Sequence, residues 1–261
     1  MSLTRNIEDW KLIDVSDSAY SDLEDKRVNW EVRSIPMLTQ VDTQVLEVLH
    51  RIVAFSLELE LPVGAFIRAL LDRENEINPS AKKGLVTNIE DEEKHLLAFQ
   101  EIARKLPAID LDKSSEISSI ASQLRKELVK SKTHPLVKAR TLETIMFTPT
   151  QAFMRIVGSL HLDTLVSDIA KDEYRHVGYN WQVSEDLGIG IDEEFEQVVM
   201  DATNYLFQPL TQNEKASGVL SYAYWYSAIE EYRETNGCTK LDNHLNYGIH
   251  NAFFELDNRY Y

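Results

Sequence analysis

The sequence predicts an all-α protein. Only 9 glycines and 7 prolines interrupt the 261 residues, and between them apolar residues recur at spacings of three and four instead of alternating. A hydrophobic content of 43% with 27% charged residues is ordinary for a globular protein with a packed core. Because no linker rich in Gly, Ser or Pro divides the chain, we expect residues 1–261 to form a single domain, a helical bundle with peripheral helices.

The first expected helices form a long hairpin. One candidate runs from about Pro36 to Leu71, with apolar residues along a single stripe. The next begins at Asn78, which can cap a helix, with Pro79 in the first helical position, and it runs to about Leu106. The first 35 residues carry no pattern that assigns an element.

A second hairpin is expected after a shorter helix over about 115–131. Its two helices cover roughly 136–160 and 162–187, and Gly188 ends the second of them. The resulting bundle spans about 36–187. Peripheral helices are expected within 192–258, over about 192–207, 216–233 and 241–256.

Charge and cysteine content exclude several function classes. The chain has 27 basic and 43 acidic residues, a net charge of −16, and a field of that sign repels phosphate backbones and anionic lipid surfaces. We therefore expect no nucleic-acid partner and no membrane partner. Cys238 is the single cysteine, which excludes an intrachain disulfide and a cysteine-based zinc site. Because the N-terminus lacks a basic start followed by an apolar run, we expect a cytoplasmic protein.

Three Glu-x-x-His motifs are the candidate sites of chemistry. On a helix, residues three apart share a face, so the carboxylate and the imidazole can reach the same ion. Chance alone would give about one such motif in this composition, so a bare motif is weak evidence. The three motifs are Glu47-Val-Leu-His50, Glu92-Glu-Lys-His95 and Glu173-Tyr-Arg-His176.

A further glutamate accompanies two of the three motifs. Glu60 precedes Glu92 by 32 residues, and because the expected turn lies near residue 76, both carboxylates should sit at the same level of the first hairpin. Glu143 precedes Glu173 by 30 residues in the second hairpin. The same half-site therefore occurs twice, which is the pattern of a dinuclear carboxylate site in a four-helix bundle.

Helical phase selects among neighbouring glutamates. At about 100° per residue, Glu60 lies on the apolar stripe of its helix and Glu58 does not. By the same geometry Glu92, rather than Glu93, aligns with the apolar residues of the next helix. The motif that begins at Glu47 lies off the stripe and has no upstream glutamate to complete it, so we interpret it as an exposed pair.

The paired motifs predict a metal site. Burying four carboxylates on apolar stripes would cost several kcal/mol each if they stayed charged and unpaired, and two divalent cations remove that cost. The alternative is a set of surface carboxylates with two satisfied histidines. Four carboxylates and two imidazoles suit Fe(II) or Mn(II) better than zinc or magnesium. We expect two divalent metal ions, most simply iron.

These motifs resemble those of the ferritin-like diiron-carboxylate superfamily, in particular those of ribonucleotide reductase small subunits. The similarity lies in Ile169-Ala-Lys-Asp-Glu-Tyr-Arg-His176 and Glu92-Glu-Lys-His-Leu-Leu-Ala-Phe99, and it extends over roughly 41–106 and 136–187. It implies a ferritin-like four-helix bundle with additional peripheral helices. It also implies that Asp172 hydrogen-bonds a ligand imidazole and fixes its tautomer. The six metal ligands that it implies are Glu60, Glu92, His95, Glu143, Glu173 and His176.

Two features depart from the radical-generating small subunits. Phe99 occupies the position, four after the first ligand histidine, where that family commonly keeps its radical tyrosine, and the chain is shorter than usual. A subgroup that resembles this pattern uses a Mn/Fe centre and needs no tyrosyl radical, so Fe/Fe and Mn/Fe centres both stay open. Ile169 stands where some N-oxygenases carry a seventh, histidine ligand, so that subclass is not supported.

Pro149 lies six residues after Glu143, inside an expected helix. An interior proline removes a backbone hydrogen bond and kinks or bulges the helix, so it marks either a bulge beside the site or a division into two helices. With a bulge, Phe99, Met146 and Phe147 would line a substrate pocket near the metals. The alternative is that these three residues are ordinary core.

One function and three alternatives follow. We expect a non-haem dimetal oxidoreductase, an oxidase or monooxygenase, that activates dioxygen to oxidise a small organic substrate. The alternatives are a divergent ribonucleotide reductase small subunit, an iron-binding or storage protein, and a metal-free helical interaction protein. Expected partners are dioxygen, the substrate, an electron donor or a large reductase subunit, and a second copy of the chain in a homodimer.

Overall fold

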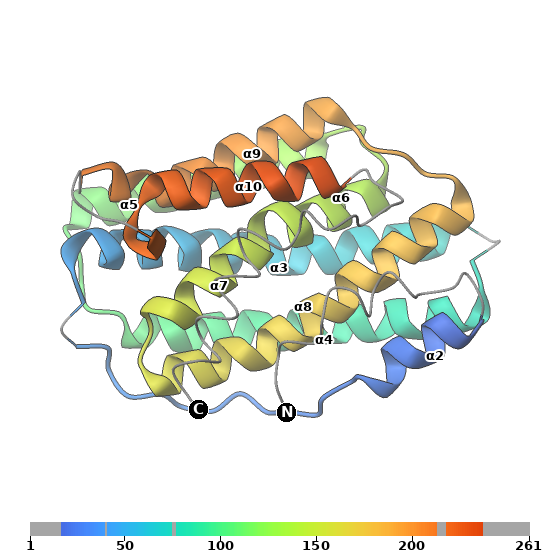
Figure 1. Ribbon diagram of the computed structural model, residues 1–261, viewed down its shortest axis with the longest axis horizontal. Coiled ribbons are helices and arrows are strands. Elements are labelled where there is room, and N and C mark those ends of the chain that lie inside the picture. Colours follow the sequence, from blue (N-terminus) through green and yellow to red (C-terminus); the bar gives the residue numbers. More distant parts are fainter. Residues whose placement is uncertain (1–16, 40, 75–76, 213–217, 237–261) are drawn as a thin grey trace.

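The structure is a computed structural model that describes residues 17–39, 41–74, 77–212 and 218–236. Every regular element in these ranges is a helix, so the predicted all-α class is confirmed (Figure 1). Within the described ranges, none of the helices combines the length and the apolar character that crossing a membrane requires. Whether residues 1–261 form a single domain stays a prediction.

The first hairpin consists of α3 (Thr43–Arg73) and α4 (Pro79–Lys105). Asn78 caps α4 as expected, because its side chain accepts the backbone N–H of Ser80. The predicted start of the first helix at Pro36 is wrong. Asp42 caps α3 through the N–H of Gln44, and the chain before it runs without helical structure along the end of α4.

Tertiary contacts hold this preceding segment. Leu38 donates its backbone N–H to the carbonyl of Lys105 at 2.9 Å, and Ser34 donates its hydroxyl to Glu101 at 2.7 Å. These contacts join residues more than 60 positions apart in sequence, which is why the apolar periodicity of the segment did not show where the helix begins.

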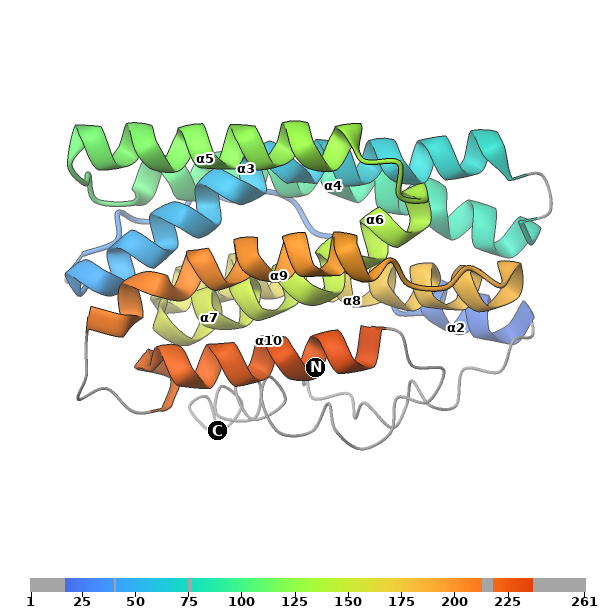
Figure 2. The ribbon, with the colours of Figure 1, turned by 90° about the horizontal axis from the view of Figure 1, so that it is seen from above.

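The helix α5 (Leu111–Lys130) packs against α3, which it follows along much of its length. It begins earlier than the expected residue 115, because the Asp110 side chain caps it through the backbone N–H groups of Asp112 and Lys113. Figure 2 shows α5 along one edge of the molecule and α10 along the opposite edge.

The second hairpin differs from the expected pair of uninterrupted helices. The segment predicted as one helix over 136–160 consists of α6 (Pro135–Thr141), the π-helical turn η1 (Leu142–Phe147) and α7 (Thr148–Val157). The next helix, α8 (Leu160–Leu187), ends at Gly188, whose φ of 65° is the left-handed conformation that suits glycine.

Pro149 therefore marks a bulge and not a division into two separate helices. It lies in the first turn of α7, directly after η1, and the chain continues as one rod through both. Proline has no N–H for the carbonyl four residues earlier. The backbone N–H of Thr148 bonds the carbonyl of Glu143 instead, five residues back, and its hydroxyl donates to the same carbonyl at 2.7 Å.

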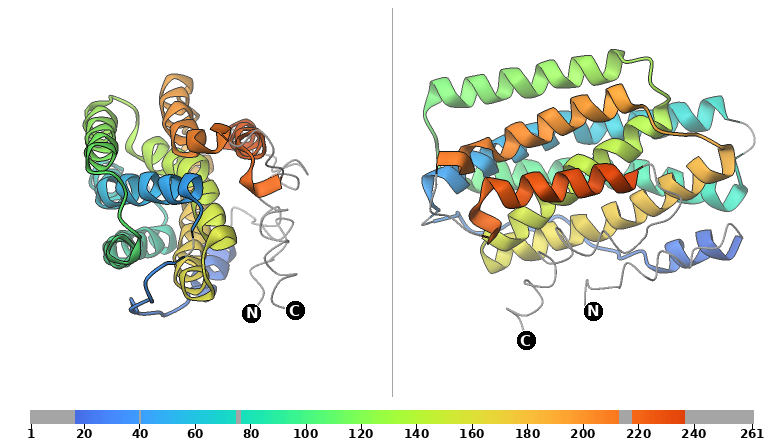
Figure 3. Two further views of the ribbon diagram at one scale, coloured as in Figure 1. Left: turned by 90° about the vertical axis from the view of Figure 1, so that its left-hand side faces the viewer. Right: turned by 45° about the horizontal axis from the view of Figure 1, so that its top comes forward.

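Four rods form a closed ring around the core. In the ring α3 packs on α4, α4 on α8, α8 on the α6–η1–α7 rod, and that rod on α3. The end view of Figure 3 shows α5 outside α3 on one side, and α9 and α10 on the other. Interior apolar side chains of all four rods belong to one continuous core.

Peripheral elements cover the ring. They are α2 (Asp17–Asp25), α9 (Glu193–Phe207), the 3-10 turns η2 (Gln208–Gln212) and η3 (Gly218–Leu220), and α10 (Tyr222–Asn236). Asp192 caps α9 as expected. Trp225 anchors α10, because its fully buried ring stacks on Phe207 and meets the edge of Phe153. The expected helix over 241–256 lies outside the described residues.

A close approach between α4 and α8 depends on glycine. A Cβ atom at Gly84 would overlap the ring of Tyr179. That ring cannot retreat, because it stacks on Tyr20 at 5.9 Å and its hydroxyl donates to the Tyr20 carbonyl at 3.2 Å.

Gly84→Ala should therefore lower the free energy of unfolding by about 1–3 kcal/mol, the usual cost of overpacking, although alanine favours helices. Urea denaturation followed by circular dichroism measures the change. The matched control is Gly64→Ala in α3, where the new Cβ would make ordinary contacts of 3.4 Å or more, so stability should stay equal or rise. Equal effects of the two substitutions would contradict the role of the Tyr179 ring.

Candidate metal centre

The six predicted ligand residues come together inside the ring. Glu60 projects from α3, Glu92 and His95 from α4, Glu143 from η1, and Glu173 and His176 from α8. Each is at most 2% exposed. Each rod of the ring thus contributes at least one carboxylate to the same interior point.

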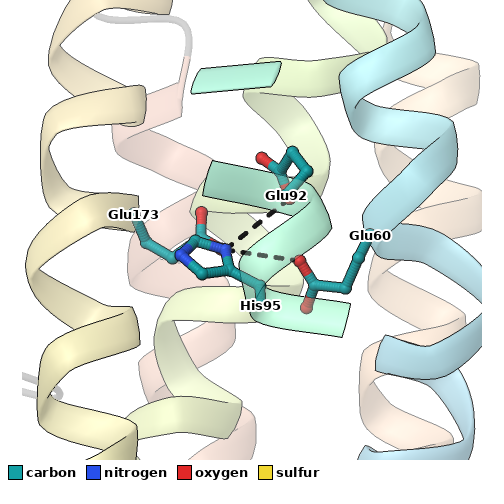
Figure 4. Close-up of side chains that lie close together, drawn as sticks. All are labelled: Glu60, Glu92, His95 and Glu173. Carbon is teal, nitrogen blue, oxygen red and sulfur yellow. Dashed lines mark ion pairs between the residues drawn. The ribbon is translucent and has the colours of Figure 1, made fainter. Parts of the chain in front are cut away.

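These residues form two overlapping clusters. In each cluster every residue offers one donor atom, and the four atoms lie within 4.8 Å of one another. Glu92 and Glu173 belong to both clusters. Figure 4 shows the first, with the side chains pointing toward one another from three helices. The clusters are Glu60, Glu92, His95 and Glu173, and Glu92, Glu143, Glu173 and His176.

The two imidazoles present the same nitrogen to the carboxylates. His95 Nδ1 lies 3.1 Å from Glu173, 3.6 Å from Glu60 and 3.7 Å from Glu92. His176 Nδ1 lies 3.2 Å from Glu92, 3.5 Å from Glu173 and 3.8 Å from Glu143. The ring centroids are 5.6 Å apart, so the two halves face each other across the shared glutamates.

An aspartate behind each imidazole decides its tautomer. His95 Nε2 faces Asp172 at 3.4 Å, and His176 Nε2 faces Asp91 at 3.5 Å. Since an ionised carboxylate only accepts, each Nε2 carries a hydrogen, and in the neutral imidazole that would bind a cation the lone pair is on Nδ1, directed at the glutamates. The hydrogen bond to an imidazole that the resemblance implies for Asp172 is therefore present.

Asp91 is a functional residue that was not predicted from the sequence. Each aspartate immediately precedes the glutamate of one motif, but it serves the histidine of the other helix, because α4 and α8 run antiparallel side by side. The signal was available as a repeated Asp-Glu-x-x-His pattern: Asp91-Glu92-Glu-Lys-His95 and Asp172-Glu173-Tyr-Arg-His176.

Cations hold the two aspartates in place. Arg175, 1% exposed, reaches both of them, at 3.3 Å from Asp172 and 3.5 Å from Asp91. Lys94 lies 3.0 Å from Asp91 and 3.7 Å from Asp172. On the outer side, Trp30 donates its indole N–H to Asp172 at 2.6 Å. Both aspartates behind the imidazoles thus have hydrogen-bond or ion-pair partners, whereas the oxygens of Glu60, Glu92 and Glu173 inside the cluster have no hydrogen bond.

Burial and mutual charge shift the pKa values of the cluster. Burial raises the pKa of Glu60 and of Glu143 well above the usual range. For Glu92 the effect of burial is outweighed by the nearby imidazoles of His176 and His95, which lower its pKa to about 2. Burial opposes the charged form of both histidines, but the surrounding carboxylates raise their pKa values well above the ordinary range. Without cations, the cluster balances its charge with protons.

The donor atoms of the cluster have no other partners within the described part of the chain. Both carboxylate oxygens of Glu60, Glu92 and Glu173, one oxygen of Glu143, and both Nδ1 atoms are buried without a hydrogen bond. Such groups ordinarily cost about 1–3 kcal/mol each. Carboxylate oxygens and imidazole lone pairs that converge on two points fit a pair of divalent cations.

One cluster member has a fixed outer partner. Asn180, on α8, donates its amide N–H to the second oxygen of Glu143. Because Glu143 lies in η1, the π-helical turn that precedes Pro149 sets the direction from which this carboxylate enters the cluster.

The interpretation of Glu47 as part of an exposed pair is wrong. Glu47 is only 6% exposed and is ion-paired to Arg51 at 2.7 Å and to Lys113 at 2.5 Å, because α5 covers this face of α3. His50 bonds the Pro107 carbonyl at 2.7 Å through Nε2. Neither residue belongs to a metal-binding cluster of the described chain.

The choices made from helical phase agree with the positions of the side chains. Glu60 and Glu92 point inward, whereas Glu58 pairs with Arg125 at 3.1 Å and Glu93 is exposed. The three residues of the expected pocket, Phe99, Met146 and Phe147, are buried in the hydrophobic core. Their role as a substrate lining stays a prediction.

No protein-family model matches this chain, and neither the curated proteins nor the solved structures contain a match to it. The geometry of the cluster therefore carries the functional argument.

Binding of Fe(II) or Mn(II) should raise the melting temperature by about 5–10 °C at saturating metal, because only the folded chain assembles the donors. Glu60→Gln should abolish most of that increase. Glu58→Gln, two residues away on the same helix and outside the cluster, is the matched control and should keep it. Differential scanning calorimetry under argon, with and without chelator, measures the shifts. A melting temperature that is indifferent to metal would contradict the site.

Asp91→Asn and Asp172→Asn should each weaken metal binding by about 10–100-fold, because an amide no longer holds the facing imidazole in its tautomer. Asp168→Asn is the control, since this α8 aspartate pairs with Arg33 and Lys171 away from the cluster. Competition with a metal-sensitive dye measures the affinity. Unchanged affinity in both variants would show that the aspartates do not orient the ligands.

Proposed function

We propose that this chain is a non-haem dimetal oxidoreductase. The observation that carries the proposal is the pair of overlapping, fully buried Glu/His clusters, whose facing donor atoms have no other partner in the described chain. One cation would be held by the cluster that contains Glu60 and His95, and the other by the cluster that contains Glu143 and His176. Glu92 and Glu173 belong to both clusters.

Donor chemistry favours redox-active metals. The set consists of four carboxylates and two imidazoles without sulfur, a combination that suits iron and manganese. Four negative charges balance two divalent cations. When bound, a pair of reduced ions of this kind would supply two electrons for the reduction of dioxygen, and this is the oxidising chemistry that we propose for the site. Iron is the first choice, and a Mn/Fe pair has the same ligand requirements.

The chain itself supplies position and exclusion of water. Asp91 and Asp172 orient the imidazoles, and Arg175 bridges both aspartates, so the two halves share one support. Phe99, one turn after His95, and Met146 are buried in the apolar core. Because the site is buried and apolar around the cluster, oxidising chemistry there would be protected from water and from solvent-exposed side chains.

A second candidate is a subunit that generates an oxidising equivalent for a larger reductase chain. One observation favours it. Trp30, 8% exposed, donates to Asp172, which faces His95, so a continuous chain of polar contacts leads from near the surface to the cluster. The indole also stacks on the His95 ring at 6.1 Å, with Lys94 4.7 Å from its centroid. An electron could pass along this route without any substrate entering the bundle.

Dioxygen consumption tests the proposal directly. Protein loaded anaerobically with two Fe(II) per chain should consume about one dioxygen per chain within a single turnover, with a change in the visible absorption spectrum. Glu60→Gln should lose the reaction, and Glu58→Gln should keep it. Iron that remains ferrous in air-saturated buffer would contradict the function.

A second arm of this experiment separates the two candidates. Trp30→Phe keeps the single turnover in both cases. If electrons enter or leave through Trp30, it should slow repeated turnover with an external electron donor at least about tenfold, because the phenyl ring cannot bond Asp172. Equal repeated turnover in this variant and the wild type would remove the argument for the reductase-subunit function.

A further inference from the structure

Asn88 is a buried polar residue that the metal centre does not use. It lies on α4, is 0% exposed, and neither its amide nitrogen nor its amide oxygen has a hydrogen-bond partner in the described chain. A carboxamide buried in this state is rare in folded proteins, because its unmet groups cost free energy. We therefore expect a bound molecule, and not a protein group, to hydrogen-bond to the Asn88 carboxamide.

Asn180 presents a second unmet group. It is also 0% exposed, and its amide nitrogen donates to Glu143. With cations in the cluster Glu143 would be an ionised carboxylate that only accepts, so the amide nitrogen of Asn180 faces it. The oxygen of Asn180 points elsewhere and has no partner among the residues described.

The two asparagines occupy equivalent places on their helices. Asn88 precedes Glu92 by four residues and His95 by seven, whereas Asn180 follows His176 by four and Glu173 by seven. At about 100° per residue, each asparagine lies between the directions of its two ligand residues, toward the interior of the ring.

The antiparallel packing of α4 and α8 places the two asparagines at the same level. The facing pairs His95–Asp172 and Asp91–His176 fix the register of the two antiparallel helices. In that register Asn88 lies across from Asn180. Each lies four residues, about 6 Å along the axis, from the nearer ligand of its helix, and both lie on the same side of the ligands.

The free groups of this pair define the ligand that it can take. Asn88 offers a donor and an acceptor, and Asn180 offers an acceptor. An anion is excluded, because two amide oxygens and the nearby carboxylates of Glu92 and Glu143 would repel it. A purely apolar group would leave all three groups unmet. A hydroxyl both donates and accepts, and it is neutral.

We propose that Asn88 and Asn180 form a binding site for one hydroxyl group beside the metal centre. The hydroxyl belongs to a bound water molecule or to an alcohol function of an organic ligand. The site rests on the two carboxamides and not on redox chemistry, so it can be tested in zinc-loaded protein, in which no dioxygen reaction takes place.

Asn88→Leu, which replaces the carboxamide by an apolar group of similar size, gives opposite results in the two cases. If a hydroxyl bonds Asn88, the variant loses those bonds, and the melting temperature of the zinc-loaded protein should fall by about 2–4 °C. If the Asn88 carboxamide has no hydrogen-bond partner, its replacement by leucine should raise the melting temperature, because two buried unpaired polar groups are removed. Asn88→Ser, which keeps a short polar group, should lie between the wild type and Asn88→Leu.

A crystal structure of the zinc-loaded wild type decides the outcome where a variant fails to fold. The expected result is an oxygen atom within hydrogen-bond distance of both carboxamides, absent in Asn88→Leu. A titration with 1-butanol then separates the sources. A saturable rise in the melting temperature of the wild type, absent in Asn88→Leu, identifies an alcohol site, and no rise identifies a water site. A rise in stability of Asn88→Leu, or no oxygen atom at this position, would overturn the proposal.

Discussion

Mutual repulsion among four buried carboxylates is the constraint on which the rest of this structure depends. Glu60, Glu92, Glu143 and Glu173 lie in the interior, where water cannot screen their charges. Protons relieve part of the repulsion in the metal-free chain, as the raised pKa values of Glu60 and Glu143 indicate. Two cations would relieve it completely and also satisfy the donor atoms. A fold stabilised only by packing would have no reason to assemble these residues at one point.

Support for the cluster comes from outside it and is nearly symmetric. Asp91 and Asp172 cross between α4 and α8, so each helix orients the histidine of the other. Arg175 joins the two aspartates, which couples the halves of the site into one network. The network also explains why burial of these acids is tolerated, because each keeps a cation and an imidazole within reach. Asn88 and Asn180 extend the same symmetry by one helical turn, with neutral carboxamides in place of the aspartates and histidines.

Irregular structure appears where the site needs it. The π-helical turn η1 contains Glu143, whose carboxylate reaches the cluster. Pro149, which cannot donate a backbone hydrogen bond, lies in the first turn of the next helix, two residues after η1 ends. A π-helical turn costs stability and is kept where it positions a functional group. The other ligands lie on the regular helices α3, α4 and α8. In α4 and α8 the spacing of three residues within each Glu-x-x-His motif is enough to direct both side chains of the motif toward the cluster.

Local periodicity determined much of this protein from the sequence alone. The all-α class, the caps at Asn78 and Asp192, and the inward direction of Glu60 follow from helical phase and from side chains that act within one turn. Tertiary structure decided what depends on neighbours distant in sequence. Glu47 is buried because α5 covers it and Lys113 pairs with it, and the segment before Asp42 is held by contacts with α4. Asp91 on α4 faces His176 on α8, and Asp172 on α8 faces His95 on α4. These pairs depend on the antiparallel packing of the two helices, which no local sequence pattern encodes.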